Sequence, residues 1–272
     1  VLYVDHRSIP NRYGTEDLEF LSAFGSQAAQ AIENARLTGK LQEEAVRRSS
    51  LLRFFPPSVV GPLMGSADFG SQVRDADVTV LFSDISGFTA MSSKLAPREV
   101  VDLLNRYFPV MAEIVFRHEG TLEKYIGDAL MAIWGVPTPH EDDADRALAA
   151  ALEMKRALER LNASFGEDRR LEIHVGLNSG PVAFGNIGSP DYVQFAAIGD
   201  TTNVSARVCT AAQSGEVLIS EATRRRLKTG KFALEPLPPV AVKGKAEPLL
   251  LHRAQWAVPD ETAGVERVLH RP

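Results

Sequence analysis

Two aspartates, each at the end of a strand-like apolar segment, are the residues of this chain best suited to metal-dependent chemistry. Asp84 follows the segment Val78–Phe82, and Asp128 follows the segment Thr121–Ile126. Either aspartate taken alone would be interpreted as a turn residue, because Asp is common in turns. A single carboxylate beside a buried sheet is also costly to desolvate. Two that converge could share divalent cations about 3.5–4 Å apart, as in two-metal sites for phosphoryl transfer. The pair therefore favours a metal site.

A short turn that contains glycine connects Asp84 to the next helix. It consists of Ile85, Ser86, Gly87, Phe88 and Thr89. A turn that opens a helix presents free backbone N–H groups, and together with the helix dipole these suit a phosphate group. Many helices begin in this way, so the turn is informative only beside Asp84, where it would form a cradle for a triphosphate and its metal.

The elements that must position these residues alternate between strand and helix patterns. We expect, in order, strand Val78–Phe82, helix Pro97–His118, strands Thr121–Ile126 and Ala129–Trp134, helix Asp142–Asn162 and strand Leu171–Asn178. This β-α-β-β-α-β order is the ferredoxin-like unit, whose first and third strands are neighbours in the sheet centre, so both aspartates can reach one spot. Beyond it we expect strands Pro181–Asn186 and Val193–Ile198, a helix over Thr201–Ala212, and short strands up to Arg253. The predicted fold class is α+β: this core with additional C-terminal strands and helices, preceded by a long helix.

Three motifs carry a resemblance to a known family, the catalytic domain of class III nucleotidyl cyclases. They are Phe82–Thr89, Lys124–Asp128 and Gly199–Arg207, and the segment Val242–Lys245 resembles the late basic turn of the same family. The resemblance covers roughly residues 75–256, with the motifs in the right order. It implies conversion of ATP to cyclic AMP and pyrophosphate, by attack of the ribose 3′-hydroxyl on the α-phosphorus.

The resemblance also assigns roles to individual residues. Asp84, Ile85 and Asp128 would bind two divalent cations, Mg²⁺ or Mn²⁺. Asn203 would orient the ribose, and Arg207 would neutralise charge on the α-phosphate in the transition state. The substrate would be bound by Lys124, Lys243 and Ala196, and by the turn of Ile85, Ser86, Gly87, Phe88 and Thr89. Lys245 is the alternative to Lys243 as the contact to the β- and γ-phosphates.

The residues that would select the base agree with the family at one position and depart from it at another. Lys124 can donate a hydrogen bond to N1 of adenine, whereas guanine carries a proton there, so Lys124 favours ATP. Ala196 stands three residues before Gly199, where the family usually carries Asp, Thr or Ser. A methyl group cannot accept the adenine amino proton, so a guanylate or relaxed-specificity cyclase remains an alternative. A non-catalytic cyclase-like module for dimerisation or nucleotide sensing is a further alternative, which the intact metal and transition-state residues disfavour.

The family forms its active site from two domains, and this implies a homodimer. The aspartates come from one domain, and the lysine, asparagine and arginine from the other. This chain carries one such domain with both half-sites complete. We therefore expect two equivalent sites in a head-to-tail homodimer, and an inactive monomer.

The residues before the predicted catalytic domain form a separate part. A helical pattern runs from Asp17 to about Phe54, with a heptad-like stripe at Leu21, Phe24, Ala28, Ala31 and Ala35. The first part of the helix, Leu21–Ala35, could pack on its own domain. The later part, Leu37–Leu52, could form a parallel dimer stalk. Val1–Asp5, followed by Asp17–Leu37, resembles the end of a GAF sensory domain, so we expect the chain to be part of a longer protein. The predicted division is residues 1–37 for the GAF remnant, 38–76 for the signalling helix and linker, 77–256 for the catalytic domain, and 257–272 for a disordered tail.

Composition excludes several other classes of function. The net charge of −5, without a basic stripe, argues against a nucleic-acid partner. No apolar run approaches the ~18 residues that a membrane span needs. The single cysteine, Cys209, rules out an internal disulfide and is consistent with a reducing compartment, so we expect a cytoplasmic protein. Among the six histidines, His118, His140, His174 and His252 are scattered and show no ligand spacing.

Overall fold

The computed structural model describes residues 4, 13–52, 55, 60, 64, 73–165, 170–189, 192–242 and 247–256. Several predictions lie outside this range: the strand at residues 1–5 apart from Val4, most of the linker 61–76, the basic turn with Lys243 and Lys245, and the tail 257–272. The chain divides into two units, residues 1–51 and 52–272, which are described separately.

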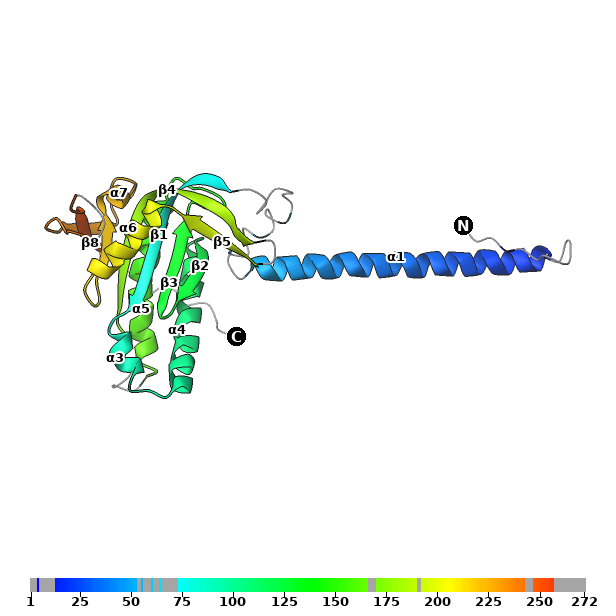
Figure 1. The fold of residues 1–272 in the computed structure, drawn as a ribbon, viewed down its shortest axis with the longest axis horizontal. Coiled ribbons are helices and arrows are strands. Elements are labelled where there is room, and N and C mark those ends of the chain that lie inside the picture. The colour runs from blue at the N-terminus through cyan, green and yellow to red at the C-terminus, as the bar shows by residue number, and fades with distance from the viewer. Residues whose placement is uncertain are drawn as a thin grey trace, which may run out of the picture. The chain divides into compact units, whose positions relative to one another are not determined.

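The first unit is one long helix, α1, which spans Thr15–Leu51 (Figure 1). Glu16 and Asp17 lie in its first turn and Arg48 in its last, as the helix dipole favours. The predicted helix is thus confirmed, although it ends three residues earlier than expected. None of its residues is buried, and large apolar side chains such as Phe20 and Ile32 are exposed within the described structure. An isolated helix is marginal in water, which favours a partner helix for α1. The dimer stalk stays a prediction.

The second unit is built on an eight-stranded sheet with the order β2-β3-β1-β4-β6-β8-β7, and β5 pairs with β4 (Figure 1). The strands are β1 Arg74–Ile85, β2 Thr121–Ile126, β3 Ala129–Trp134, β4 Ile173–Ser189, β5 Tyr192–Ile198, β6 Val217–Ser220, β7 Phe232–Pro236 and β8 Leu251–Trp256. The helices are α3 Phe88–Ser92, α4 Pro97–Arg117, α5 Asp143–Asn162, α6 Asp200–Ala211 and α7 Glu221–Arg224. The order β4-β1-β3-β2 within the sheet is that of the ferredoxin-like unit, so the predicted core is confirmed.

Two strands are longer than predicted. Strand β1 begins at Arg74, four residues before the predicted start. Strand β4 continues through Gly180 and Pro181, where the sequence suggested a break between two strands, and it pairs with β1 from Ile173 to Phe184. Thr201 of α6 stabilises this passage, because its Oγ1 donates a 2.8 Å hydrogen bond to the carbonyl of Pro181.

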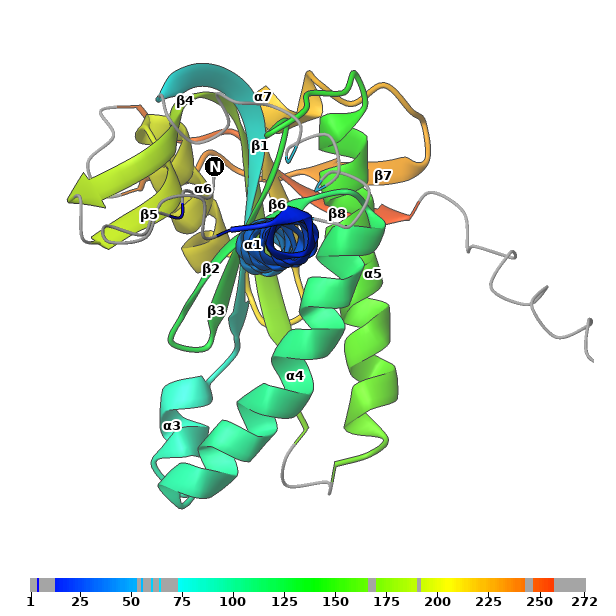
Figure 2. The same ribbon diagram turned by 90° about the vertical axis from the view of Figure 1, so that its right-hand side faces the viewer.

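Helices cover the two faces of the sheet in different ways. Figure 2 shows α4 and α5 side by side, and their apolar residues form one core with Val175 and Leu177 of β4. Gly176, between these two, faces the other way, toward α6. A Cβ on Gly176 would lie 2.0 Å from the amide nitrogen of Cys209, so α6 can rest on the sheet only because this residue is glycine. The Oγ of Ser205 donates a 2.7 Å hydrogen bond to the carbonyl of Val80 in β1, which fixes α6 against the strand that carries Asp84.

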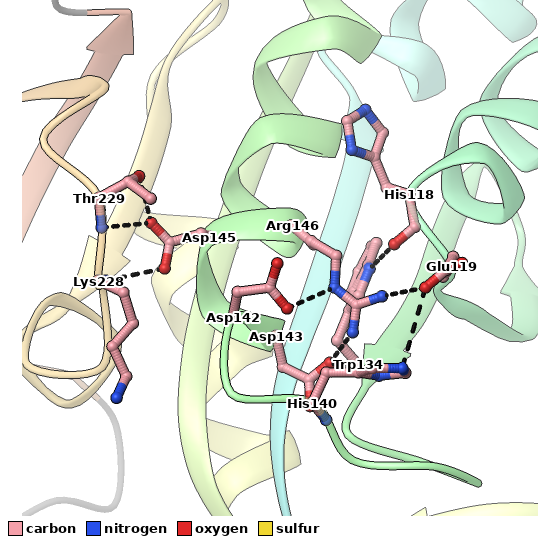
Figure 3. A network of polar contacts seen from close by, with 10 residues as sticks. All are labelled: His118, Glu119, Trp134, His140, Asp142, Asp143, Asp145, Arg146, Lys228 and Thr229. Carbon is pink, nitrogen blue, oxygen red and sulfur yellow. Dashed lines mark hydrogen bonds and ion pairs between the residues drawn. The ribbon is translucent and has the colours of Figure 1, made fainter.

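A polar network fixes the start of α5 on the far side of the core (Figure 3). Arg146 donates to Glu119 and to Asp143, with both distances 2.6 Å. Asp145 is buried and accepts hydrogen bonds from the amides of Lys228 (2.8 Å) and Thr229 (3.0 Å). These carboxylates are held by cationic and backbone donors, so they stabilise the helix start and the loop before β7.

Candidate functional site

The two candidate metal-binding aspartates come together at one edge of the sheet. Strand β1 pairs antiparallel with β3 from Thr79 to Ser83, and Asp128 lies in the tight turn between β2 and β3. The two carboxyl groups are close enough to share a hydrogen bond. Partial burial and the neighbouring Asp84 carboxylate raise the pKa of Asp128 to about 6. Two acids held this close repel each other when both are ionised, and that arrangement suits a shared cation.

The surroundings of Asp84 hold its side chain in place. Its Oδ1 accepts a hydrogen bond from the amide of Ile85 at 3.0 Å, and its Oδ2 lies 3.7 Å from Nε2 of His174. The other ring nitrogen of His174 lies 3.1 Å from the Oγ of Ser86. His174 could not be selected from the sequence, because its place opposite Asp84 follows from the antiparallel register of β1 and β4. A prediction of that strand register would have identified His174 as a neighbour of Asp84.

The turn after Asp84 has the backbone geometry that its glycine allows. Gly87 has a φ of 69°, a left-handed conformation, and the amide of Ser86 donates to the carbonyl of Glu172 at 2.8 Å. The side chain of Ile85 is buried in the core, so only its backbone carbonyl could face a cation. Phe88 packs against the core and Thr89 is exposed.

Asn203 and Arg207 lie one turn apart on α6. Asn203 is exposed, and Arg207 is partly buried. The Nη1 of Arg207 is buried and has no hydrogen-bond partner among the described residues. A guanidinium nitrogen withheld from water without an acceptor is costly, and an anionic group would satisfy it. Within the described part of this single chain, no ion pair links Arg207 to Asp84 or Asp128.

The base-selecting positions lie near each other on β2 and β5. The Nζ of Lys124 lies 3.0 Å from Oε1 of Glu123, and the backbone amide of Ala197 faces the Glu123 carboxylate. Ala196, the residue before Ala197 in β5, is buried. Glu123 was not singled out from the sequence, because a glutamate in a strand looks like a solvent-facing residue. Lys243, the candidate phosphate contact, lies outside the described residues.

The donor set at Asp84 and Asp128 fits divalent cations that a nucleotide also binds. No group of three or more His, Cys, Asp and Glu side chains suited to a metal occurs in the part of the chain that the structure describes. Mg²⁺ is commonly held by one or two carboxylates together with substrate phosphates. Two carboxylates and a backbone carbonyl therefore suit a metal ion that also binds a triphosphate better than a metal ion held by the protein alone.

The repulsion between the two aspartates should make metal-free stability depend on pH. The pKa of Asp128 is about 6 in the folded chain against an ordinary value of 3.8, so the folded state binds the proton more tightly than the unfolded state. The stabilisation of the folded state by protonated Asp128 is fully present below pH 3.8 and is lost as the pH rises through about 6. In Asp128→Asn we expect a melting temperature about 1–3 °C higher than the wild type at pH 8 without metal, and a smaller difference at pH 5. Mn²⁺ should raise the melting temperature of the wild type but not of the variant.

Scanning calorimetry in a chelating buffer measures both effects. Asp102→Asn, on the exposed surface of α4, is the matched control and should follow the wild type at every pH. A lower melting temperature for Asp128→Asn than for the wild type at pH 8 would contradict the proposed repulsion between the two carboxylates.

Comparison with known proteins agrees with this geometry. Residues 71–253 match the family model described as the adenylate and guanylate cyclase catalytic domain. The structure is similar to the adenylyl cyclase CyaB from P. aeruginosa, with 30% sequence identity, a TM-score of 0.67, and coverage of 70% of this chain and 98% of that one. It is also similar to the guanylyl cyclase Cya2, with 31% identity, a TM-score of 0.65, and coverage of 70% and 97%.

Curated relatives include enzymes of both specificities. Adenylate cyclase 1 of Rhizobium meliloti is 29% identical over 196 residues, which is 71% of this chain and 29% of that protein. Guanylate cyclase 2G of Rattus norvegicus is 29% identical over 231 residues, which is 84% of this chain and 20% of that protein. The chain thus spans less than a third of the length of these relatives.

Two further findings bear on the setting of the site. No helix in the described ranges is both long and apolar enough to cross a bilayer. Cyclase domains of this kind act as dimers on nucleotide substrates and generally use divalent metal ions. The family match covers most of the chain and includes both aspartates, Asn203 and Arg207. This chain belongs to the family of class III adenylate and guanylate cyclase catalytic domains.

Proposed function

We propose that this chain is an adenylate cyclase that converts ATP to 3′,5′-cyclic AMP and pyrophosphate in the cytoplasm. The observation that carries the proposal is the convergence of Asp84 and Asp128: partial burial and the neighbouring Asp84 carboxylate together raise the pKa of Asp128. A structural neighbour named as an adenylyl cyclase and a curated sequence relative named as an adenylate cyclase support it. Lys124 supports ATP over GTP, because an ammonium group can donate to N1 of adenine.

The reaction is an in-line displacement, in which the ribose 3′-hydroxyl bonds to the α-phosphorus and the bond to pyrophosphate breaks. Positioning and charge neutralisation account for most of the catalysis in such reactions. Asn203 orients the ribose, and Arg207 places its guanidinium against the α-phosphate as charge develops there. The turn from Ile85 to Thr89, together with Lys243, binds the phosphates that leave.

Asp84, Ile85 and Asp128 would hold two divalent cations, Mg²⁺ or Mn²⁺. When bound, these ions supply charge neutralisation on the triphosphate and lower the pKa of the attacking hydroxyl. The carboxylates of Asp84 and Asp128 fix where the ions sit, and the hydrogen bond from the Ile85 amide keeps Asp84 in one orientation.

The active site is shared across a homodimer, to which α1 contributes a parallel stalk. The aspartates of one protomer work with Lys124, Asn203 and Arg207 of the partner. The unsatisfied Nη1 of Arg207 supports this arrangement, because the acceptor that it needs would arrive with the nucleotide bound by the other protomer. In this proposal residues 1–37 belong to a GAF sensory domain, and residues 38–76 transmit its signal to the catalytic domain at 77–256.

A guanylate or relaxed-specificity cyclase is the second candidate. Ala196 favours it, because its buried methyl group offers no acceptor for the adenine amino group. Losing one hydrogen bond costs about 0.5–1.5 kcal/mol net, which corresponds to only a modest loss of base discrimination.

Measuring cyclic product from ATP and from GTP with Mn²⁺, across a range of protein concentrations, tests the proposal. We expect cyclic AMP as the main product, with a specific activity that falls on dilution as dimers dissociate. Cyclic GMP as the main product would support the second candidate. No turnover of either nucleotide by a confirmed dimer would show a non-catalytic module.

A further inference from the structure

A bulge in β2 brings an unexpected acidic side chain to the base-selecting part of the site. Leu122 pairs with Ala132 and Lys124 with Met131, so Glu123 is the extra residue between them. Leu122 and Ala132 belong to the core under α4 and α5, whereas Met131 belongs to the cluster on the opposite face. The bulge therefore turns two consecutive side chains, Glu123 and Lys124, to the same face.

Glu123 is buried without adequate partners. Its side chain is 3% exposed, and its Oε1 lies 3.0 Å from Nζ of Lys124. Neither carboxylate oxygen has a partner with hydrogen-bond geometry among the described residues. Burial raises the pKa of Glu123, while the ammonium of Lys124 and the amide of Ala197 lower it. A buried carboxylate with incomplete hydrogen bonding is costly, and such a group persists where a ligand completes its hydrogen bonds.

The carboxylate of Glu123 lies close to β5, the strand whose base-selecting position lacks an acceptor. The carboxylate faces the backbone amide of Ala197. The preceding residue, Ala196, is buried at 5% exposure and carries only a methyl group. An acceptor is thus absent from position 196 of β5, whereas β2 carries one whose hydrogen bonds are incomplete.

We propose that Glu123 is a specificity-determining residue of this cyclase: its carboxylate accepts the 6-amino proton of adenine in place of the missing side chain at position 196, while Lys124 donates to N1. This inference rests on the proposed function. The pair matches adenine at two adjacent atoms. Guanine presents an acceptor, O6, to the carboxylate and a donor, N1–H, to the ammonium, so both contacts become repulsive.

Two substitutions at Glu123 separate this role from a structural one. Glu123→Ala removes the acceptor, and Glu123→Gln keeps the volume but adds an amide that can donate to O6 of guanine. In both we expect the ratio of kcat/KM for ATP to that for GTP to fall at least about tenfold, as for a hydrogen bond to a charged group. In Glu123→Ala, the added substitution Ala196→Thr should restore most of the ratio, because it returns an acceptor to β5. Glu141→Ala, at an exposed position outside the site, should leave the ratio unchanged.

Stability and binding measurements keep the outcomes distinct. Glu123→Gln should melt close to the wild type, because relief of a desolvated carboxylate offsets the loss of its ion pair with Lys124. Calorimetric binding of α,β-methylene ATP and GTP with Mn²⁺ reports base preference without turnover. If the wild type prefers the ATP analogue and both variants lose that preference, Glu123 has the proposed role, even if no cyclic product forms and the proposed function fails. If the variants fold and keep the wild-type preference in binding and turnover, the inference is wrong.

Discussion

Asp84→Ala should lower the rate of cyclic AMP formation at least about a thousandfold, more than the loss of a single hydrogen-bond donor in a transition-state site. Asp84 lies at the end of β1 with its Oδ1 fixed by the Ile85 amide, and it is the nearest charged neighbour of Asp128. Without it, one carboxylate would remain to hold the cations, and charge on the triphosphate would be poorly neutralised. The measurement is the initial rate with ATP and saturating Mn²⁺.

The folded state should survive this substitution, so the loss can be assigned to chemistry. Asp84 contributes to the raised pKa of Asp128, so its removal relieves a repulsion, at the loss of the 3.7 Å contact with Nε2 of His174. We therefore expect an unchanged or higher melting temperature without metal. Asp84→Asn, which keeps the shape of the side chain, should be as inactive as Asp84→Ala, whereas Asp102→Asn on α4 should be fully active. A rate for Asp84→Ala within tenfold of the wild type would rule out this carboxylate as a metal ligand.

The core of the fold could be predicted because its signals are local. The order of strands and helices from β1 to β4 follows from alternating and helical apolar patterns, and the order of elements determines that β1 and β3 are neighbours. Asp84 and Asp128 each end an apolar strand, so their convergence followed from the same argument.

Other features depend on contacts between distant segments and could not be predicted in this way. Strand β4 runs through Gly180 and Pro181 because Thr201 of α6 bonds there, although the local residues are typical of a turn. His174 contacts Asp84 through strand register. Glu123 faces the base-selecting residues because of a single bulge, which no periodic pattern reveals. These features depend on tertiary contacts, which override local preferences.

Mixing two inactive variants should restore activity. In Asp84→Ala the metal half-site is lost but Arg207 is intact, and in Arg207→Ala the aspartates are intact but the guanidinium is lost. A mixed dimer contains one site with both defects and one in which the aspartates of the Arg207→Ala chain meet Arg207 of the other chain. With random exchange in an equimolar mixture, half of the dimers are mixed and each has one of two sites intact, so we expect about a quarter of the wild-type activity.

This result would discriminate between a shared site and one contained in a single chain. A site within one chain would gain nothing from mixing, because each chain would still carry its own defect. The rate should rise from that of the separate variants as subunits exchange, at the rate of dimer exchange measured with differently labelled chains. Mixing Asp84→Ala with Asp128→Ala is the matched control, since both defects fall in the same half-site and no mixed dimer has an intact site. If mixed dimers of Asp84→Ala and Arg207→Ala form and stay as inactive as this control, the buried Nη1 of Arg207 must have a partner other than a nucleotide held by the second protomer.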